Sequence, residues 1–307
     1  NFKPGTMEKW GIGYAALAQR FPRLIHATVT GFGADGPLGG MPGYDMMVQA
    51  WSGLLSVNGS PQSGPLRIGV PLVDMAAGTN LVIGILLALV ARSRTGAGQH
   101  VDVTLYDSAL GFSHPHSPNW FLSGKAPALS GNDNPNIAPY SLYHTRHGAL
   151  IIAVGNDLQF ARLCEVMGRP ELARDPRFAL NAQRVIHHGE LRAIIEETIA
   201  DMQGEPLCQA LLAAGVPAGL VQSIPEALQH PHTLHREMVV TDGEYRWTGI
   251  PVKLSATPGS VRRPPPQFNE HVDEVLGESG FAPAEIAGLR ERGVVGNPRR
   301  KSRDGTA

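Results

Sequence analysis

An apolar run from Leu81 to Ala91 lies between two segments with strand-like patterns. The run is about half as long as a bilayer crossing requires and follows the polar pair Thr79 and Asn80, so we expect a buried helix. Leu24–Thr30 is β-branched and apolar, and His100–Asp107 alternates with a period of two. Strand, helix and strand in this order predict a parallel α/β layer over residues 24–110.

The segments around this layer predict four parts. Residues 1–112 are expected to form a large α/β domain with a parallel sheet, and residues 113–139, rich in Pro, Ser, Asn and Gly, a linker or active-site loop. Residues 140–230 form a smaller α+β domain with a strand over 148–155 and helices over 159–167 and 189–202. Residues 231–307 pass through a proline-rich connection at 251–266, return to the large domain and end in a charged tail.

Local patterns refine the large domain. Residues 31–43 hold six glycines and two prolines, which is typical of a loop. Residues 44–55 have helical spacing with Met47, Ala50, Trp51 and Leu54 on one face, and residues 66–73 are predicted to be extended.

Composition excludes several classes of partner. Lys and Arg total 26 against 27 Asp and Glu, so no field of one sign favours nucleic acid or an anionic membrane. The two cysteines are too few for a disulfide scaffold and suit a reducing compartment, so we expect a cytoplasmic protein. The chain opens on Asn1, without a signal-peptide pattern, and we expect that it begins inside a longer protein.

Two common motifs are present but weak. Gly31, Gly33 and Gly36 match the dinucleotide fingerprint, but the third glycine is followed by Pro and Gly rather than by a helix, which favours a flexible loop. The histidines at 114 and 116, and those at 230, 232 and 235, are interrupted by prolines and have no carboxylate or cysteine at ligand spacing. We therefore expect no metal site.

Asp74 is a lone carboxylate in an apolar string where an extended segment meets the predicted buried helix. One interpretation is an N-cap, a position that aspartate favours. The other is a nucleophile, because the helix dipole and the free amides at a helix N-terminus favour the ionised carboxylate. The pattern alone leaves both open.

A series of short motifs extends through nearly the whole chain in order and resembles the class III (CaiB/BaiF-type, formyl-CoA transferase-like) CoA transferases. The motifs are Pro22-Arg23-Leu24-Ile25, Thr30-Gly31-Phe32-Gly33, Gly36-Pro37, Pro42-Gly43-Tyr44-Asp45, Gly69-Val70-Pro71, Asp74, Ile83-Gly84-Ile85-Leu86, Thr95-Gly96-Ala97-Gly98-Gln99, Val101-Asp102-Val103, Asn136-Ile137-Ala138-Pro139-Tyr140, Ala153-Val154-Gly155-Asn156, Asp175-Pro176-Arg177-Phe178 and Gly215-Val216-Pro217-Ala218-Gly219.

The resemblance implies an enzyme that moves CoA from an acyl-CoA donor to a small carboxylic or dicarboxylic acid. Asp74 would attack the thioester, form a mixed anhydride and then carry CoA as a thioester. The chemistry needs no permanently bound metal or redox cofactor, because one acyl bond replaces another, and coenzyme A enters as a substrate.

Further site residues are carried over by position. The matched CoA-binding positions are Asn1, Phe2, Lys3, Lys9, Pro42, Gly43, Tyr44 and Asp45. The family's active-site glycine loop falls within residues 131–138, where a glycine run is absent, and its substrate-facing positions are Asn134, Pro135, Asn136 and Ile137. The family also implies a Rossmann-like parallel sheet in the large domain, an interlocked homodimer, and roughly ninety further residues before Asn1 that complete the CoA domain.

Two alternatives stay open. Acyl-CoA racemases and epimerases share this fold but pair the aspartate with a histidine at the position of Tyr44, and a tyrosine with its ordinary pKa near 10 is a poor acid/base group at neutral pH. This difference favours a transferase. The second alternative is an inactive truncated homologue.

Overall fold

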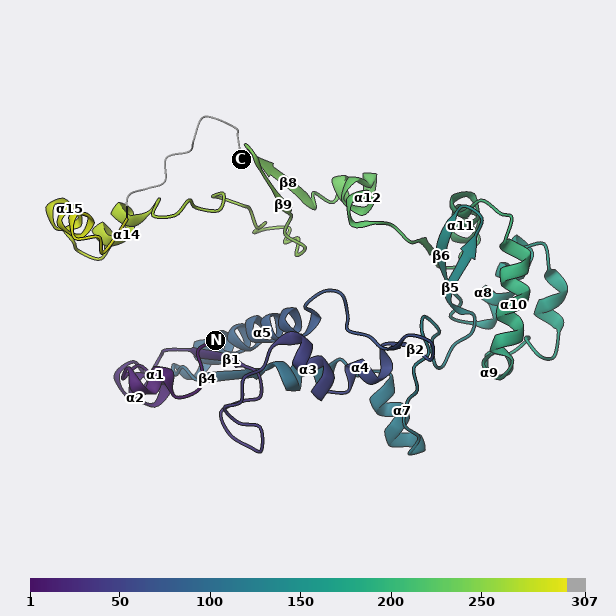
Figure 1. The fold of residues 1–307 in the computed structure, drawn as a ribbon, viewed down its shortest axis with the longest axis horizontal. Helices are drawn as coiled ribbons and strands as arrows, with labels where there is room; N and C mark the ends of the chain where they lie inside the picture. Colours follow the sequence, from purple (N-terminus) through teal and green to yellow (C-terminus); the bar gives the residue numbers. More distant parts are fainter. Residues whose placement is uncertain (297–307) are drawn as a thin grey trace. The chain divides into compact units, whose positions relative to one another are not determined.

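The computed structural model describes residues 1–296 and divides the chain into two units, Asn1–Val221 and a unit that begins at Gln222. The predicted charged tail lies for the most part outside the described residues. Each unit is described separately (Figure 1).

The first part of unit 1 contains a parallel strand pair. Strand β1 (His26–Thr30) pairs with β4 (His100–Thr104) in register from His26 opposite His100 to Thr30 opposite Thr104, and α5 (Leu72–Thr95) connects them and packs beside both strands (Figure 1). The predicted parallel strand–helix–strand layer is confirmed. The other elements here are α1 (Thr6–Lys9), α2 (Tyr14–Arg20), α3 (Asp45–Trp51), α4 (Leu54–Val57), β2 (Gly59–Ser60), β3 (Gly64–Pro65), α6 (Leu105–Gly111) and α7 (His116–Ser123).

Several predicted boundaries are wrong. The chain turns helical at Leu72, two residues before Asp74, rather than staying extended to Val73. Strand β4 ends at Thr104, whose hydroxyl accepts a hydrogen bond from Asp107 N and so caps α6. The segment 113–139 is not wholly irregular, because α7 lies in it.

The core faces of the helices also differ from the predictions. In α3 the buried side chains are Val48 and Gln49, whereas Met47 and Trp51 are exposed. Along α5 the apolar residues surround the helix, and only Val73, Ala76, Ala77 and Ala88 are buried. Val82, Ile83, Leu86, Leu87 and Val90 are about half exposed or more, so the expected buried helix is only partly covered by the described residues. By length and composition alone α5 could cross a membrane, a test that core helices of globular proteins also pass.

The second part of unit 1 has a closed core. The antiparallel sheet β5–β6–β7 consists of β5 (Tyr140–Thr145), β6 (Gly148–Ala153) and β7 (Ala218–Leu220). Around it lie α8 (Asp157–Val166), the 3-10 helix η1 (Pro170–Arg174), α9 (Asn181–Ile186), α10 (His188–Ile199) and α11 (Gly204–Ala213). The predicted strand over 148–155 and both predicted helices are confirmed, while β5 and β7 were not predicted.

Unit 2 is small and thinly packed. It contains α12 (Ile224–Gln229), α13 (Pro231–His235), the antiparallel hairpin of β8 (Val239–Asp242) and β9 (Tyr245–Thr248), α14 (Val272–Glu278) and α15 (Pro283–Glu291). Residues 251–266 form no helix or strand, in agreement with the predicted proline-rich connection.

Candidate active site

Asp74 is the third residue of α5, where the backbone N–H groups have no partner within the helix. The cap residue Pro71 supplies no side-chain acceptor. Instead Asp45 Oδ2, at the start of α3, accepts hydrogen bonds from Val73 N at 2.7 Å and Asp74 N at 3.2 Å. Asp45 therefore caps α5 from another helix, and the N-cap interpretation of Asp74 is wrong.

The Asp74 carboxylate has no hydrogen bond or ion pair with any residue from 1 to 296. It lies on the wall of a cavity of about 610 Å³. Five segments form the wall: residues 1–4, the end of β1, the loop before α3, the first turns of α5 and the start of α6. The lining residues are Asn1, Phe2, Lys3, Pro4, Val29, Thr30, Gly31, Gly40, Met41, Pro42, Gly43, Tyr44, Asp74, Ala77, Gly78 and Leu105.

The cavity brings together most of the predicted CoA-binding residues. Asn1, Phe2 and Lys3 line it on one segment, and Pro42, Gly43 and Tyr44 on another, together with Asp74. Lys9 and Asp45 do not line it: Lys9 ends α1 on the surface, and the Asp45 carboxylate is engaged with the α5 amides. Tyr44 is 77% exposed, so its ring is available to a ligand.

The glycines of the loop before α3 have a steric role. A Cβ on Gly31 would lie 2.6 Å from Gly43 Cα, so the end of β1 and the loop 40–44 can approach this closely only as glycines. This contact places both segments on the same cavity wall. Gly36 is followed by turns rather than a helix, in agreement with the weak standing of the dinucleotide motif.

The electrostatics of Asp74 differ from the sequence expectation. Partial desolvation, and then the negative charge of Asp45, raise the pKa of the Asp74 carboxyl above its usual 3.8. The direction is opposite to the one expected from the helix dipole. Asp74 thus combines an unpaired carboxylate with a raised affinity for protons, which makes it a better nucleophile once it is ionised.

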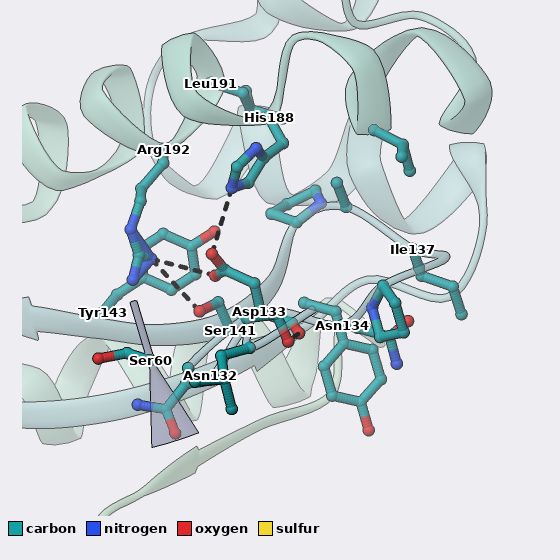
Figure 2. A pocket seen from close by; sticks show the side chains of 18 of the residues that line it. Ser60, Asn132, Asp133, Asn134, Ile137, Ser141, Tyr143, His188, Leu191 and Arg192 are labelled. Carbon is teal, nitrogen blue, oxygen red and sulfur yellow. Dashed lines mark hydrogen bonds and ion pairs between the residues drawn. The ribbon is translucent and has the colours of Figure 1, made fainter. Parts of the chain in front are cut away.

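A second cavity, of about 620 Å³, holds most of the predicted substrate loop (Figure 2). Asn134, Pro135 and Ile137 line it, whereas Asn136 lies outside and its amide donates to Asn119 Oδ1 at 3.4 Å. The loop is attached to the β2 strand, because Gly131 N donates to Gly59 O at 2.7 Å. These contacts fix a loop that the sequence predicted only by position.

Asp133, which sequence reasoning did not select, is the paired carboxylate of this second cavity. Figure 2 shows it between two residues of α10, with His188 Nε2 at 3.2 Å from Oδ2 and Arg192 Nη1 at 3.5 Å from Oδ1. Arg192 also donates to Ser141 Oγ at 3.3 Å. His188 and Arg192 lie more than fifty positions along the chain from Asp133, so no local pattern could have revealed the cluster.

Metal ligands do not gather in the described part of the chain. Within residues 1–296 no group of three or more His, Cys, Asp or Glu side chains could hold a metal ion. Cys164 and Cys208 are both buried and unbridged.

Comparison with known proteins decides the family. A family model described as CoA-transferase family III matches residues 1–272. The chain belongs to this family. The sequence-based recognition of a CaiB/BaiF-type CoA-transferase enzyme is confirmed, and such enzymes use CoA thioesters as substrates.

Individual relatives agree with this family. The chain is 39% identical over 265 residues to the acetyl-CoA:oxalate CoA-transferase of Acetobacter aceti, covering 86% of this chain and 68% of the relative. It is 38% identical over 283 residues to the succinate–glutarate CoA-transferase of Agrobacterium fabrum, covering 91% and 71%. The crystal structure of a CAIB/BAIF family protein from Brucella suis superposes with a TM-score of 0.78 at 37% identity, over 91% of this chain and 74% of that one. The chain therefore spans roughly two thirds to three quarters of these relatives.

Proposed function

We propose that this family III enzyme moves CoA from an acyl-CoA donor to a free carboxylic acid, with Asp74 as the covalent carrier. One observation carries the proposal: the unpaired Asp74 carboxylate lies on the wall of a cavity of about 610 Å³ beside Lys3, Gly43 and Tyr44. Lys3 offers a point charge to a CoA phosphate, and the exposed Tyr44 ring offers an apolar surface to the rest of the CoA molecule.

The transfer proceeds through two kinds of covalent intermediate. An Asp74 carboxylate oxygen attacks the donor's thioester carbon, the C–S bond breaks, and CoA leaves as the thiolate from an aspartyl-acyl anhydride. The thiolate attacks the Asp74 carbonyl carbon of that anhydride and releases the donor acid as a carboxylate, which leaves an aspartyl-CoA thioester. The acceptor carboxylate repeats both steps in reverse order, so that Asp74 is regenerated and the new acyl-CoA departs.

The enzyme's other residues bind and shield these groups. An anhydride must be kept from water, and the glycine backbone at Gly31 and Gly43 allows close wall-to-substrate contact without side chains. We expect no resident metal or redox cofactor, because each step exchanges one acyl bond for another. The substrate-loop role of Asn134, Pro135, Asn136 and Ile137 remains part of this proposal.

The acceptor is proposed to be a small carboxylic or dicarboxylic acid. The names of the two relatives above include oxalate, succinate and glutarate, all short diacids. A screen of such acids with acetyl-CoA and succinyl-CoA as donors identifies the pair by the thioester that forms.

A homodimer is also proposed, as is a cytoplasmic location. The exposed apolar side chains of α5, among them Leu86 and Leu87, support an assembly that covers this helix, because faces of this kind usually mark an interface. The buried, unbridged cysteines suit a reducing compartment.

The proposed reaction is tested by product formation with the purified protein. We expect a new thioester from acyl-CoA and free acid, and loss of this product in Asp74→Ala. Asp35→Asn, which changes an exposed carboxylate outside the cavity, is the matched control and should keep full activity. Full transfer by Asp74→Ala contradicts the proposal. Exchange of the substrate's α-hydrogen for deuterium without any acceptor acid would indicate the racemase or epimerase alternative instead, and absence of both reactions would indicate the inactive homologue.

A further inference from the structure

Gln49 is a polar side chain with no exposed surface, in the middle of α3. Both ends of its amide are used. Nε2 donates to Asp45 Oδ1 at 2.6 Å, and Oε1 accepts from Ile68 N at 2.9 Å. A buried amide that satisfies a backbone group on one side and a carboxylate on the other is costly to remove, because its partners would be left unpaired.

The Asp45 carboxylate links Gln49 to the helix turn that carries Asp74, the proposed nucleophile. While Oδ1 accepts from Gln49, Oδ2 accepts from the amides of Val73 and Asp74. Both oxygens are therefore engaged away from the cavity, which does not include Asp45 on its wall. These contacts favour a role other than the CoA contact expected from the sequence.

The same bonds hold an irregular segment in its middle and at the helix that follows it. Residues 66–71 have no helix or strand, yet Ile68 is held by Gln49 and the first turn of α5 by Asp45. Helix α3 is itself anchored, because Val48 packs in one core cluster with Val73 and Ala77 of α5. The place where Asp74 enters the cavity is thus set by α3 through two side chains.

We propose that Asp45 and Gln49 are positioning residues for the transfer reaction, holding the first turn of α5 so that the Asp74 carboxylate faces the bound thioester. This inference rests on the proposed function of Asp74. Gln49 orients the Asp45 carboxylate, Asp45 caps the first turn of α5, and neither touches the substrate.

The network also has an electrostatic consequence. Asp45 is the charged group that raises the pKa of Asp74, after desolvation. The other ionisable side chains on the same cavity wall are those of Lys3 and Tyr44. Replacing Asp45 by a neutral residue removes a negative charge beside the nucleophile, so the pKa of Asp74 falls.

The first variant is Asp45→Asn, which keeps one oxygen for the α5 amides and loses the charge. We expect kcat to fall about 10- to 100-fold, because a displacement of roughly 1 Å at a reacting group costs about 10²-fold. The KM for acyl-CoA should stay within about threefold, since no binding contact is lost. The acidic limb of the kcat profile should move to lower pH.

The second variant is Gln49→Met, of similar length but without hydrogen bonds. It should lower kcat by about 10-fold and leave KM unchanged. Leu163→Ala in α8 is the control, because Leu163 is equally buried but belongs to the other core cluster and lines neither cavity. This control should lower the thermal midpoint while leaving kcat, KM and the pH profile as in the wild type, which separates positioning from general stability.

The outcomes separate the two proposals. Transfer by Asp74→Ala overturns the proposed function and this inference together. If Asp74→Ala is inactive while Asp45→Asn and Gln49→Met keep wild-type kcat and an unmoved acidic limb, only the positioning role is overturned. A loss confined to KM in Asp45→Asn would likewise overturn it and return Asp45 to the CoA site. If either variant does not fold, its partner is measured alone against the same criteria.

Discussion

The two cavities of unit 1 are almost equal in volume, about 610 and 620 Å³, but their carboxylates are held in opposite ways. The backbone N–H of Asp74 is capped by Asp45, but the Asp74 side chain has no partner among residues 1–296, and the pKa of its carboxyl is raised. Asp133 lies between His188 and Arg192. An unpaired carboxylate is available to attack an electrophile, whereas one that contacts an arginine and a histidine is stabilised as a structural anion.

The strongest test of this difference between Asp74 and Asp133 is to neutralise each carboxylate in turn. Asp74→Asn should lower the rate of CoA transfer by at least about 10³-fold, because loss of a covalent nucleophile removes the step that all later steps require. Asp133→Asn keeps the size and part of the hydrogen bonding, and should lower kcat by less than about 10-fold. The measurement is steady-state thioester formation. Similar losses in both variants would contradict the distinction.

The next largest expected effect is on stability, at the arginine that packs behind the second cavity. Arg184 is fully buried, and its guanidinium donates to Ala138 O at 2.6 Å, to Phe178 O at 2.9 Å and to Asp157 Oδ1 at 2.7 Å. Arg184→Met leaves these acceptors unpaired and should lower the free energy of unfolding by about 3 kcal/mol.

The control for Arg184→Met is Arg174→Met, at an exposed site, which should change stability by less than about 0.5 kcal/mol. Denaturant titration followed by circular dichroism measures both variants. Equal stability of the two would show that the buried guanidinium does not support the core.

The effects of the two substitutions on stability should have the opposite order to their effects on activity. Asp133→Asn weakens contacts with the partly exposed side chains of His188 and Arg192 and should destabilise the fold by up to about 1 kcal/mol. Asp74→Asn removes a carboxylate whose charge is disfavoured by partial desolvation and by Asp45, so it should leave stability unchanged or raise it by a few tenths of a kcal/mol. Thermal melts at pH 7 test this, and a clear loss in Asp74→Asn would mean that the carboxylate has a structural partner.

The pH dependence gives the smallest effect. Asp74 attacks only when ionised, and its pKa lies above the usual 3.8. As the pH falls, protonation therefore stops the reaction at a higher pH than for an unperturbed aspartate, so the acidic limb of kcat/KM should have its midpoint above pH 3.8. Circular dichroism at each pH confirms that the protein stays folded. A midpoint below that value would contradict the raised pKa.

Patterns local to one element predicted the fold well, and contacts between distant elements were missed. The β-branched run at His26–Thr30 and the period-two alternation up to Thr104 are patterns within single segments, and both segments are strands of one parallel pair. Of the two interpretations left open for Asp74, the N-cap is wrong, because the cap comes from Asp45, which is 29 positions earlier in the chain. Gln49 was missed for the same reason, since a polar residue gives no periodic signal of burial.

The exposed apolar surface of α5 shows a second limit of sequence patterns. Leu81–Ala91 was predicted to be buried, yet its side chains are largely exposed in the described residues. An apolar run indicates that a surface must be covered, but it does not say by which residues or chain. The substrate loop proposed at residues 131–138, in contrast, follows from the order of motifs alone, and three of its four proposed positions line a cavity.

The most direct test of the central claim is to trap the covalent intermediate. The purified enzyme is mixed with an acyl-CoA donor without acceptor acid, quenched, digested with trypsin and examined by mass spectrometry. We predict an adduct of CoA, linked with loss of water, on the peptide Ile68–Arg92, with fragmentation that assigns it to Asp74. An active enzyme that yields no adduct, or one located on Asp45 or Asp133, would contradict the account.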